Sequence, residues 1–370
     1  MRHLIAAAAM LVVAAPASAQ LGGLGGALKK AQEQKQQIDD LVISESEERT
    51  IGQDVSARIR QRFGVVQDPA IHRYVTLVGT ALAEQSERPK LAWTFIVLDT
   101  DGVNAFASPG GFVHITRGAL GLLQNEAELA GVLGHEIGHV ARKHTVNAIQ
   151  KNKAVAAGVN SAAGGRSALL ERMANQAYTM VLENSFDRGD EIDADRVGVQ
   201  LAQKAGYATA LDDFLTRLDE RNRDSAERNG LFASHPETKE RIGKIQQLGA
   251  ASKSSALVEP RYKSSVKYEV PPIAGIAVVT EGSAGLAGSG QGSGKAAAKS
   301  DKKEEPKKRA FGLSALKGSA SQEKQSTQVS ASGGARGLGA DRAAKGGSNP
   351  NPVKVAVTPA EVSAFKKGIA

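Results

Sequence analysis

The amino-acid sequence predicts an α+β fold, in which a mainly helical domain carries a small mixed or antiparallel sheet and a disordered tail follows. Several separated segments place apolar residues at the spacing of an amphipathic helix. Three short runs rich in β-branched and aromatic residues follow one another between residues 91 and 116. From residue 281 the chain is rich in Gly, Ser, Ala and Lys, so it cannot bury enough apolar surface to offset the entropy of ordering.

The N-terminal residues 1–19 are predicted to be an export signal. A short polar start precedes an apolar run over 4–15, and Ala17-Ser18-Ala19 fits a small-residue cleavage site. The chain contains no cysteine, which excludes disulfides, lipidation at a cysteine and thiol-ligated zinc. We therefore expect a periplasmic protein, with secretion as the alternative.

The positive charge of the chain is concentrated at its C-terminal end. The formal net charge is +8, and residues 281–370 alone contain 15 Lys and Arg against 7 Asp and Glu. The rest of the chain is therefore neutral, which argues against nucleic-acid binding by the folded part. We expect the tail to be a solvated extension, with peripheral contact to an anionic envelope surface as the alternative.

The helices of the domain have recognisable starts. Acidic residues follow Ser44, Pro69 follows Asp68, and Asn125 with Glu128 forms a capping box at the start of the strongest helix. Helices are expected from residue 45, from residue 69, and over 125–147, 187–204, 210–222 and 236–248, and strands over 91–98, 103–107 and 111–116. The predicted divisions are a signal peptide (1–19), a linker (20–44), the domain (45–250), an extension with one or two strands (251–280), a disordered basic tail (281–357) and a short helix (358–370).

The motif H-E-x-x-H, formed by His135, Glu136 and His139, lies within the strongest predicted helix. Residues four apart share one face of a helix, so both imidazoles can bind one cation. Glu136 would lie beside the open position of the metal, where it can take a proton from a metal-bound water and pass it to the leaving amine. The alternative is two histidines on a solvated helix face. The apolar residues around the motif argue against it, because burying unpartnered polar groups is costly.

A third ligand is expected on the helix over 187–204. Glu191 and Asp195 are four residues apart and share a face, which suits one metal ligand and one carboxylate that accepts a proton from a ligand imidazole. Asp190 and Asp193 are expected to point into solvent. From spacing alone, a plain acidic helix start remains an alternative reading of this segment.

The H-E-x-x-H motif followed some fifty residues later by E-x-x-A-D resembles the gluzincin zinc metallopeptidases related to the HtpX heat-shock protease and the CAAX prenyl proteases. The chain is most similar in character to their soluble periplasmic, BepA-like branch. The resemblance implies a zincin-type domain, one Zn²⁺ per chain, Glu191 as the third metal ligand and Asp195 as the hydrogen-bond partner of a ligand imidazole. Unlike its relatives, the chain shows neither membrane spans nor a helical-repeat domain after the catalytic part.

The same resemblance implies roles for four further residues. His235, which precedes Pro236, would approach the zinc and act in catalysis or control access to it; a helix-capping role is the alternative. Asn104, Ala105 and Phe106 would belong to a strand edge that binds extended peptide through its backbone. His144, in contrast, lies nine residues after His135. On one continuous helix it would face away from the metal, so we expect it to be structural.

Together these features predict a zinc-dependent endopeptidase that acts on unfolded or misassembled cell-envelope proteins as its substrates. The alternative is a zinc-containing periplasmic chaperone or assembly factor with little or regulated proteolysis.

Overall fold

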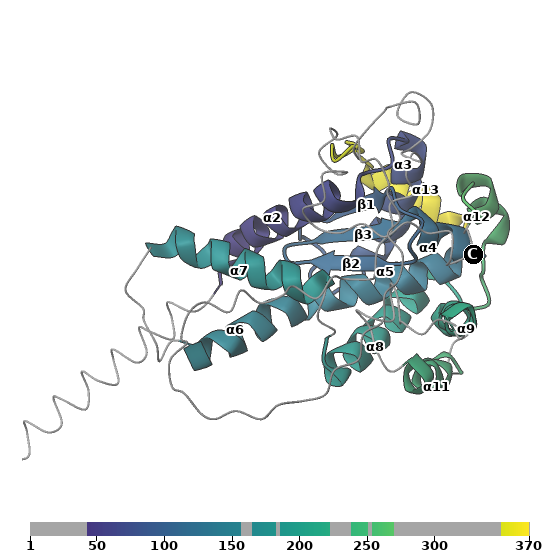
Figure 1. Ribbon diagram of the computed structural model, residues 1–370. Coiled ribbons are helices and arrows are strands. Elements are labelled where there is room, and N and C mark those ends of the chain that lie inside the picture. Colours follow the sequence, from purple (N-terminus) through teal and green to yellow (C-terminus); the bar gives the residue numbers. More distant parts are fainter. Residues whose placement is uncertain are drawn as a thin grey trace, which may run out of the picture.

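A three-stranded sheet lies at the centre of the domain, with helices against both of its faces (Figure 1). The computed structural model describes residues 43–156, 165–182, 186–222, 238–250, 254–269 and 349–369. The elements are α2 (Glu45–Phe63), α3 (Pro69–Ala83), β1 (Thr94–Leu98), β2 (Ala105–Ser108), β3 (Phe112–Thr116), α4 (Arg117–Leu122), α5 (Glu126–Ala141), α6 (His144–Ala156), α7 (Gly165–Leu182), α8 (Arg188–Ala205), α9 (Leu211–Asn222), α11 (Thr238–Gly249), α12 (Glu259–Ser265) and α13 (Pro359–Lys367).

The sheet is mixed, with the strand order β1-β3-β2. Strands β1 and β3 are parallel, whereas β2 and β3 are antiparallel and joined by a tight turn at Gly110 and Gly111. This confirms the predicted α+β class and the small mixed sheet. Within the described part of the chain, β2 therefore forms one edge of the sheet.

The two faces of the sheet contribute to two different apolar cores. Phe95 and Val97 of β1 pack into a core with α3, α5, α8 and α9. Ile96 and Leu98, which point to the opposite face, pack into a core with α2 and α7. The sheet thereby supports α5 from one side, and α5 in turn contacts α8 (Figure 1).

The predicted helix starts are confirmed at α2, α3, α5 and α8. Ser44 forms a reciprocal capping box with Glu47, and the side chains of Asp68, Asn125 and Asp187 accept backbone N–H groups of the first helical turns. Helix α9 also agrees with its prediction, and α11 is described from Thr238, while the predicted start at 236 lies outside the described residues.

The helix predicted over 125–147 is instead two helices. Helix α5 ends at Ala141, Lys143 adopts a left-handed backbone with φ 58°, and α6 begins at His144. The prediction of one continuous helix is therefore wrong. The break was not predicted because no glycine or proline stands at residues 142–144 to indicate it. A non-glycine residue in the left-handed region is uncommon, so local propensity does not predict this turn.

Three helices were not predicted: α4, α7 and α12. Helix α12 lies in the extension 251–280, and residues 270–280, to which most of the expected strand region belongs, lie outside the described residues. Among the described helices, none combines the length and the apolar character needed to cross a membrane.

Residues 349–369 lie against the domain although they are far from it in sequence. The backbone oxygens of Asn349, Pro350 and Asn351 accept hydrogen bonds from Val65, Arg60 and Gln67 respectively. The predicted terminal helix is present as α13, which packs on α3. The structure thus differs from the expected disorder for 349–357, because these backbone groups bond to the domain. The predicted signal peptide (1–19), most of the linker, and residues 281–348 of the tail lie outside the described residues.

Candidate metal centre

Helices α5 and α8 cross at very close range, and this crossing brings the predicted ligands together. A Cβ atom on Gly198 of α8 would lie 2.7 Å from the backbone nitrogen of His135, and one on Gly134 of α5 would lie 2.9 Å from the backbone oxygen of Gly198. Real Cβ atoms essentially never approach as closely as the first distance. Glycine at both positions therefore sets how closely the H-E-x-x-H helix approaches the helix of Glu191.

The side chains of His135, His139 and Glu191 converge on one point between these helices. Nε2 of His139 lies 3.1 Å from Nε2 of His135 and 3.4 Å from a carboxylate oxygen of Glu191. Nε2 of His135 lies 3.7 Å from the other carboxylate oxygen. All three residues are buried, and they form the group of potential ligands found among the described residues.

This group fits a zinc ion. Four-coordinate zinc is tetrahedral with Zn–N and Zn–O bonds of about 2.0–2.2 Å, so neighbouring ligand atoms lie roughly 3.3–3.6 Å apart. The three distances of 3.1, 3.4 and 3.7 Å scatter around that range. Two imidazole nitrogens and one carboxylate are also a ligand set that zinc favours. Three protein ligands leave a fourth position for a reactant.

Asp195 and Arg241 support two of these three side chains. Oδ1 of Asp195 lies 2.9 Å from Nδ1 of His135, and Arg241 donates two hydrogen bonds of 2.7 Å to the Asp195 carboxylate. Arg241 also pairs with Glu191 at 2.9 Å. Burial by itself would raise the pKa of Asp195, but the Arg241 guanidinium outweighs it and holds that pKa at about 2. Asp195 is therefore an anion that accepts the Nδ1 proton of His135, leaving Nε2 to face the cation.

The contact of Asp195 with His135 is the one its predicted role requires, whereas no role was predicted for Arg241. Arg241 comes from α11 and lies far from Asp195 in the chain, so no helical spacing relates the two residues. Its burial places a fixed positive charge beside two carboxylates. Burial would lower the pKa of Arg241, but Asp195, Glu191 and Glu136 raise it. Arg241 thus stays protonated and connects α11 to α8.

His144 is the residue that sequence reasoning placed wrongly. Because α5 ends at Ala141, His144 does not continue round the same helix but returns to the site, where its Nδ1 lies 3.0 Å from Nδ1 of His139. Asp190 and Asp193, expected in solvent, approach its other ring nitrogen. The only feature of the sequence that indicates the contact between His144 and His139 is their separation of five residues.

Glu136, the predicted proton acceptor and donor, is buried beside these groups. It follows His135 on α5, its exposed fraction is 1%, and its charge helps to raise the pKa of Arg241. That Glu136 lies beside the open position of the metal stays a prediction. The predicted catalytic residue His235 lies outside the described residues.

Ala105 and Phe106 are the first residues of the edge strand β2, which packs against α5, and Asn104 directly precedes it. The side-chain oxygen of Asn104 accepts the backbone N–H of Ala105, and the ring of Phe106 stacks on Phe63 with centroids 5.7 Å apart. The Phe106 side chain thus belongs to the core. The backbone of the strand is the part suited to a peptide, and substrate binding there stays a prediction.

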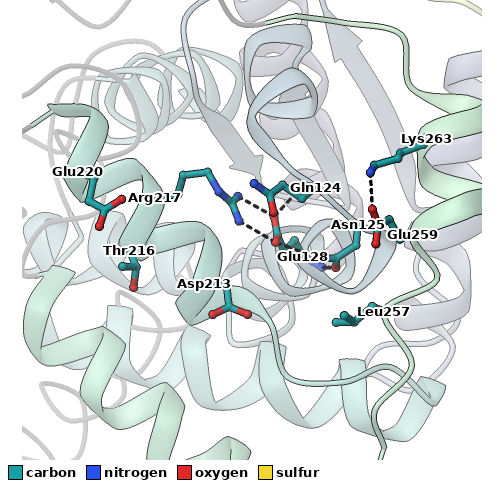
Figure 2. Close-up of a pocket in the computed structure, with 10 residues that line it drawn as sticks. All are labelled: Gln124, Asn125, Glu128, Asp213, Thr216, Arg217, Glu220, Leu257, Glu259 and Lys263. Carbon is teal, nitrogen blue, oxygen red and sulfur yellow. Dashed lines mark hydrogen bonds and ion pairs between the residues drawn. The ribbon is translucent and has the colours of Figure 1, made fainter.

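A cleft of about 690 Å³ lies near the N-terminal end of α5 (Figure 2). It is lined by Gln124, Asn125, Glu128, Asp213, Thr216, Arg217, Glu220, Leu257, Glu259 and Lys263. Its two basic side chains are already paired: Arg217 donates to both carboxylate oxygens of Glu128, and Lys263 pairs with Glu259 (Figure 2). The residues that line this cleft include no histidine.

A mainly helical α+β domain with a buried His-His-Glu group, built on an H-E-x-x-H helix and a second helix, defines a metallopeptidase of the zincin class. Comparison with known families agrees with this class. Residues 69–248 match the model of Peptidase family M48, and the chain carries a peptidase domain of this family.

Three relatives illustrate the similarity. The chain is 28% identical over 207 residues to the "Beta-barrel assembly-enhancing protease" of Yersinia pestis, covering 52% of this chain and 42% of the relative. It is 28% identical over 204 residues to the "Mitochondrial metalloendopeptidase OMA1" of Schizosaccharomyces pombe, covering 54% and 60%. It is 29% identical over 159 residues to the "Metalloprotease YcaL" of Escherichia coli, covering 42% and 61%. The chain thus spans about two fifths of the length of the first of these relatives.

Proposed function

We propose that this protein is a zinc-dependent endopeptidase that hydrolyses peptide bonds of unfolded or misassembled cell-envelope proteins. The observation that carries the proposal is the buried convergence of His135, His139 and Glu191 between α5 and α8. Polar groups of this kind are costly to bury unless a bound cation or hydrogen bonds compensate them. Membership in a metallopeptidase family supports the same conclusion.

The residues of the chain have distinct tasks in this reaction. Zinc bound by the trio would supply Lewis acidity and a hydroxide-like nucleophile at neutral pH. Glu136 would accept the proton released from the nucleophile and return it to the leaving amine, as a general base and then a general acid. Asp195 holds His135 in the tautomer that presents Nε2. Arg241 balances the charge of Asp195 and orients Glu191.

The substrate class rests on the relatives and on the sheet edge. One group of relatives is named for enhancing β-barrel assembly, which supports envelope proteins as substrates. The edge strand β2, next to α5, supports binding of extended peptide by strand addition, which selects unfolded segments by backbone rather than by sequence. The predicted signal at 1–19 supports action in the periplasm.

Metal analysis combined with proteolysis tests the proposal. Purified full-length protein should contain close to one zinc per chain and should degrade casein, used as an unfolded substrate. Glu136→Gln should retain zinc but lose activity by about 10²–10⁴-fold, the usual contribution of a general acid–base group. Glu87→Gln, which changes an exposed glutamate outside the site, is the matched control and should cleave normally.

Full activity of Glu136→Gln would contradict the proposed mechanism. Rescue of an envelope defect in cells by the inactive Glu136→Gln protein would instead support an assembly factor whose proteolysis is incidental.

A further inference from the structure

The turn between α5 and α6 directs His144 back towards the metal centre. The chain leaves α5 after Ala141, and the left-handed Lys143 reverses its course while its N–H donates to the Val140 oxygen. The first residue of α6 is His144 itself. Its side chain is therefore presented from a new helix rather than from the far face of the H-E-x-x-H helix.

The two imidazoles of His139 and His144 are in direct contact and sealed from water. Their Nδ1 atoms lie 3.0 Å apart, and their ring planes are nearly perpendicular with centroids 5.0 Å apart. Both residues are buried, with exposed fractions of 1% and 5%. The ring of Phe186 lies against His139, with centroids 4.0 Å apart. At this separation one Nδ1 donates a proton and the other accepts it.

The surroundings of each ring decide which nitrogen donates. If Nε2 of His139 faces a cation, the proton of this neutral ring must be on Nδ1, so His139 donates and Nδ1 of His144 accepts. The proton of His144 is then on Nε2. That nitrogen lies 3.5 Å from a carboxylate oxygen of Asp193 and 3.7 Å from one of Asp190. The negative side chains thus lie where this tautomer places its N–H.

Asp193 is itself held in place. Arg196 donates to one of its carboxylate oxygens at 2.5 Å, and Arg142 pairs with the other at 3.1 Å. Two guanidinium groups thus fix the Asp193 carboxylate in its place beside His144. A fixed anion next to Nε2 of His144 favours the proton on that nitrogen and leaves Nδ1 as an acceptor.

From this arrangement we propose that His144 is a positioning residue, which accepts the Nδ1 proton of His139 and so fixes the ring and tautomer of this metal ligand. The two ligand imidazoles would then be oriented by different groups, His135 by the anion Asp195 and His139 by a neutral imidazole backed by Asp193 and Asp190. A neutral partner orients His139 without adding a full negative charge next to the ion.

The inference rests on the proposed metal site and is tested by metal affinity and spectroscopy rather than by cleavage alone. The full-length protein is stripped of metal, and its dissociation constant for Zn²⁺ is measured by competition with a chromophoric chelator. Co²⁺ is then added as a spectroscopic probe of ligand geometry. His144→Leu should weaken Zn²⁺ binding by about 10–100-fold and change the Co²⁺ absorption spectrum, because loss of such a partner typically has this effect.

Two conservative variants separate the hydrogen bond from simple packing. Asn places its amide near the position of Nδ1, whereas Gln reaches towards the position of Nε2. We expect His144→Asn to retain most of the affinity and the wild-type Co²⁺ spectrum, and His144→Gln to lose affinity. The control is His72→Leu, which removes a buried histidine whose Nε2 bonds to the Val66 backbone oxygen and should leave Zn²⁺ affinity unchanged.

Each possible outcome supports or overturns the proposed role of His144. Equal Zn²⁺ affinity of wild type and His144→Leu would overturn the inference. If His144→Leu does not fold, equal affinities of the Asn and Gln variants would overturn it instead. Failure of the wild type to bind Zn²⁺ would refute the metal site and the inference together. Normal binding, weakened in His144→Leu, without casein cleavage would contradict the proposed function but support the role of His144.

Discussion

The two ends of helix α5 bury polar groups in opposite ways. Near the N-terminal end, the carboxylate of Glu126 has an exposed fraction of 0% and accepts hydrogen bonds from Tyr74 at 2.8 Å, from Tyr207 at 2.7 Å and from two nitrogens of Arg261. Near the C-terminal end, His135 and His139 turn the same kind of atom, Nε2, towards each other and towards the Glu191 carboxylate. At the N-terminal end the carboxylate is surrounded by hydrogen-bond donors, whereas at the C-terminal end two imidazole nitrogens and a carboxylate, all possible acceptors, face one another.

This difference separates a structural site from a functional one on the same helix. Glu126 connects α5 to α3, to α12 and, through the contact of Arg261 with Phe365, to α13. The hydrogen bonds and the positive charge that the Glu126 carboxylate requires are supplied by the protein, so no ligand is required there. At the other end, acceptors that meet at 3.1–3.7 Å are suited to a cation. Burial alone does not distinguish the two ends; the balance of donors and acceptors does.

The largest expected effect concerns the metal end. Zinc binds the folded trio and has no preformed site in the unfolded chain, so it should stabilise the protein by about 4 kcal/mol at a free concentration one thousand times the dissociation constant. Urea unfolding with zinc and with a chelator measures this difference. Glu191→Ala should lose it, and equal stabilisation of that variant would show that zinc binds elsewhere.

The next effect concerns the N-terminal end. Glu126→Gln should destabilise the protein by about 2–3 kcal/mol, because it removes the buried charge that accepts hydrogen bonds from Tyr74, Tyr207 and the partly exposed Arg261. Glu84→Gln is the matched control, since Glu84 pairs with Lys366 at the surface and such pairs contribute less than about 1 kcal/mol. Denaturant unfolding compares the two variants. Similar losses in both would contradict the structural role given to Glu126.

A smaller effect is expected at the helix crossing. Gly198→Ala should cost about 1–3 kcal/mol, because its Cβ would displace α8 from α5. It should also weaken zinc binding, since α8 carries Glu191. Gly243→Ala on α11 has no heavy atom within 4 Å of its new Cβ and should stabilise by roughly 0.5–1 kcal/mol through helix propensity. Thermal melts and zinc titrations of both variants test this; unchanged zinc affinity in Gly198→Ala would argue against the tight crossing.

The most gradual effect is expected with pH at the Glu126 end. Burial and the nearby Glu126 raise the pKa of Tyr74 and of Tyr207 above the usual value of 10.0. Above pH 10 the unfolded chain would ionise these tyrosines while the folded protein keeps them neutral, so stability is intact below pH 10 and falls as pH rises above it. Phenolate absorbance should therefore appear for Tyr74 and Tyr207 only on unfolding. Their ionisation in the folded protein would contradict the hydrogen bonds to Glu126.

The sequence predicted the parts of the site that depend on local spacing. The H-E-x-x-H motif placed His135 and His139 on one face, and the capping residue Asn125 marked the start of their helix. The four-residue spacing of Glu191 and Asp195 predicted a shared face on α8. These relations follow from helical geometry, which depends on neighbours in the chain.

The roles of His144 and Arg241 could not be predicted in the same way. His144 was misplaced because a left-handed Lys143 breaks the helix without a glycine or proline signal. Arg241 reaches Asp195 from a helix 46 residues away in sequence, so only the packing of α11 on α8 brings them together. The ordering of 349–357 likewise depends on hydrogen bonds to residues more than 280 positions earlier.

The sequence by itself determined the class of fold, the helix that carries the catalytic motif and the two candidate histidine ligands, because each follows from local periodicity and spacing, whereas Glu191 was assigned as the third ligand through the family resemblance. The tertiary structure alone decided how near α5 and α8 approach, which groups orient each imidazole and which buried carboxylate is saturated with donors. Those properties depend on contacts between segments that are distant in the chain. Residue spacing predicts neighbours within one helix or strand, but it does not predict a hydrogen bond between two such segments.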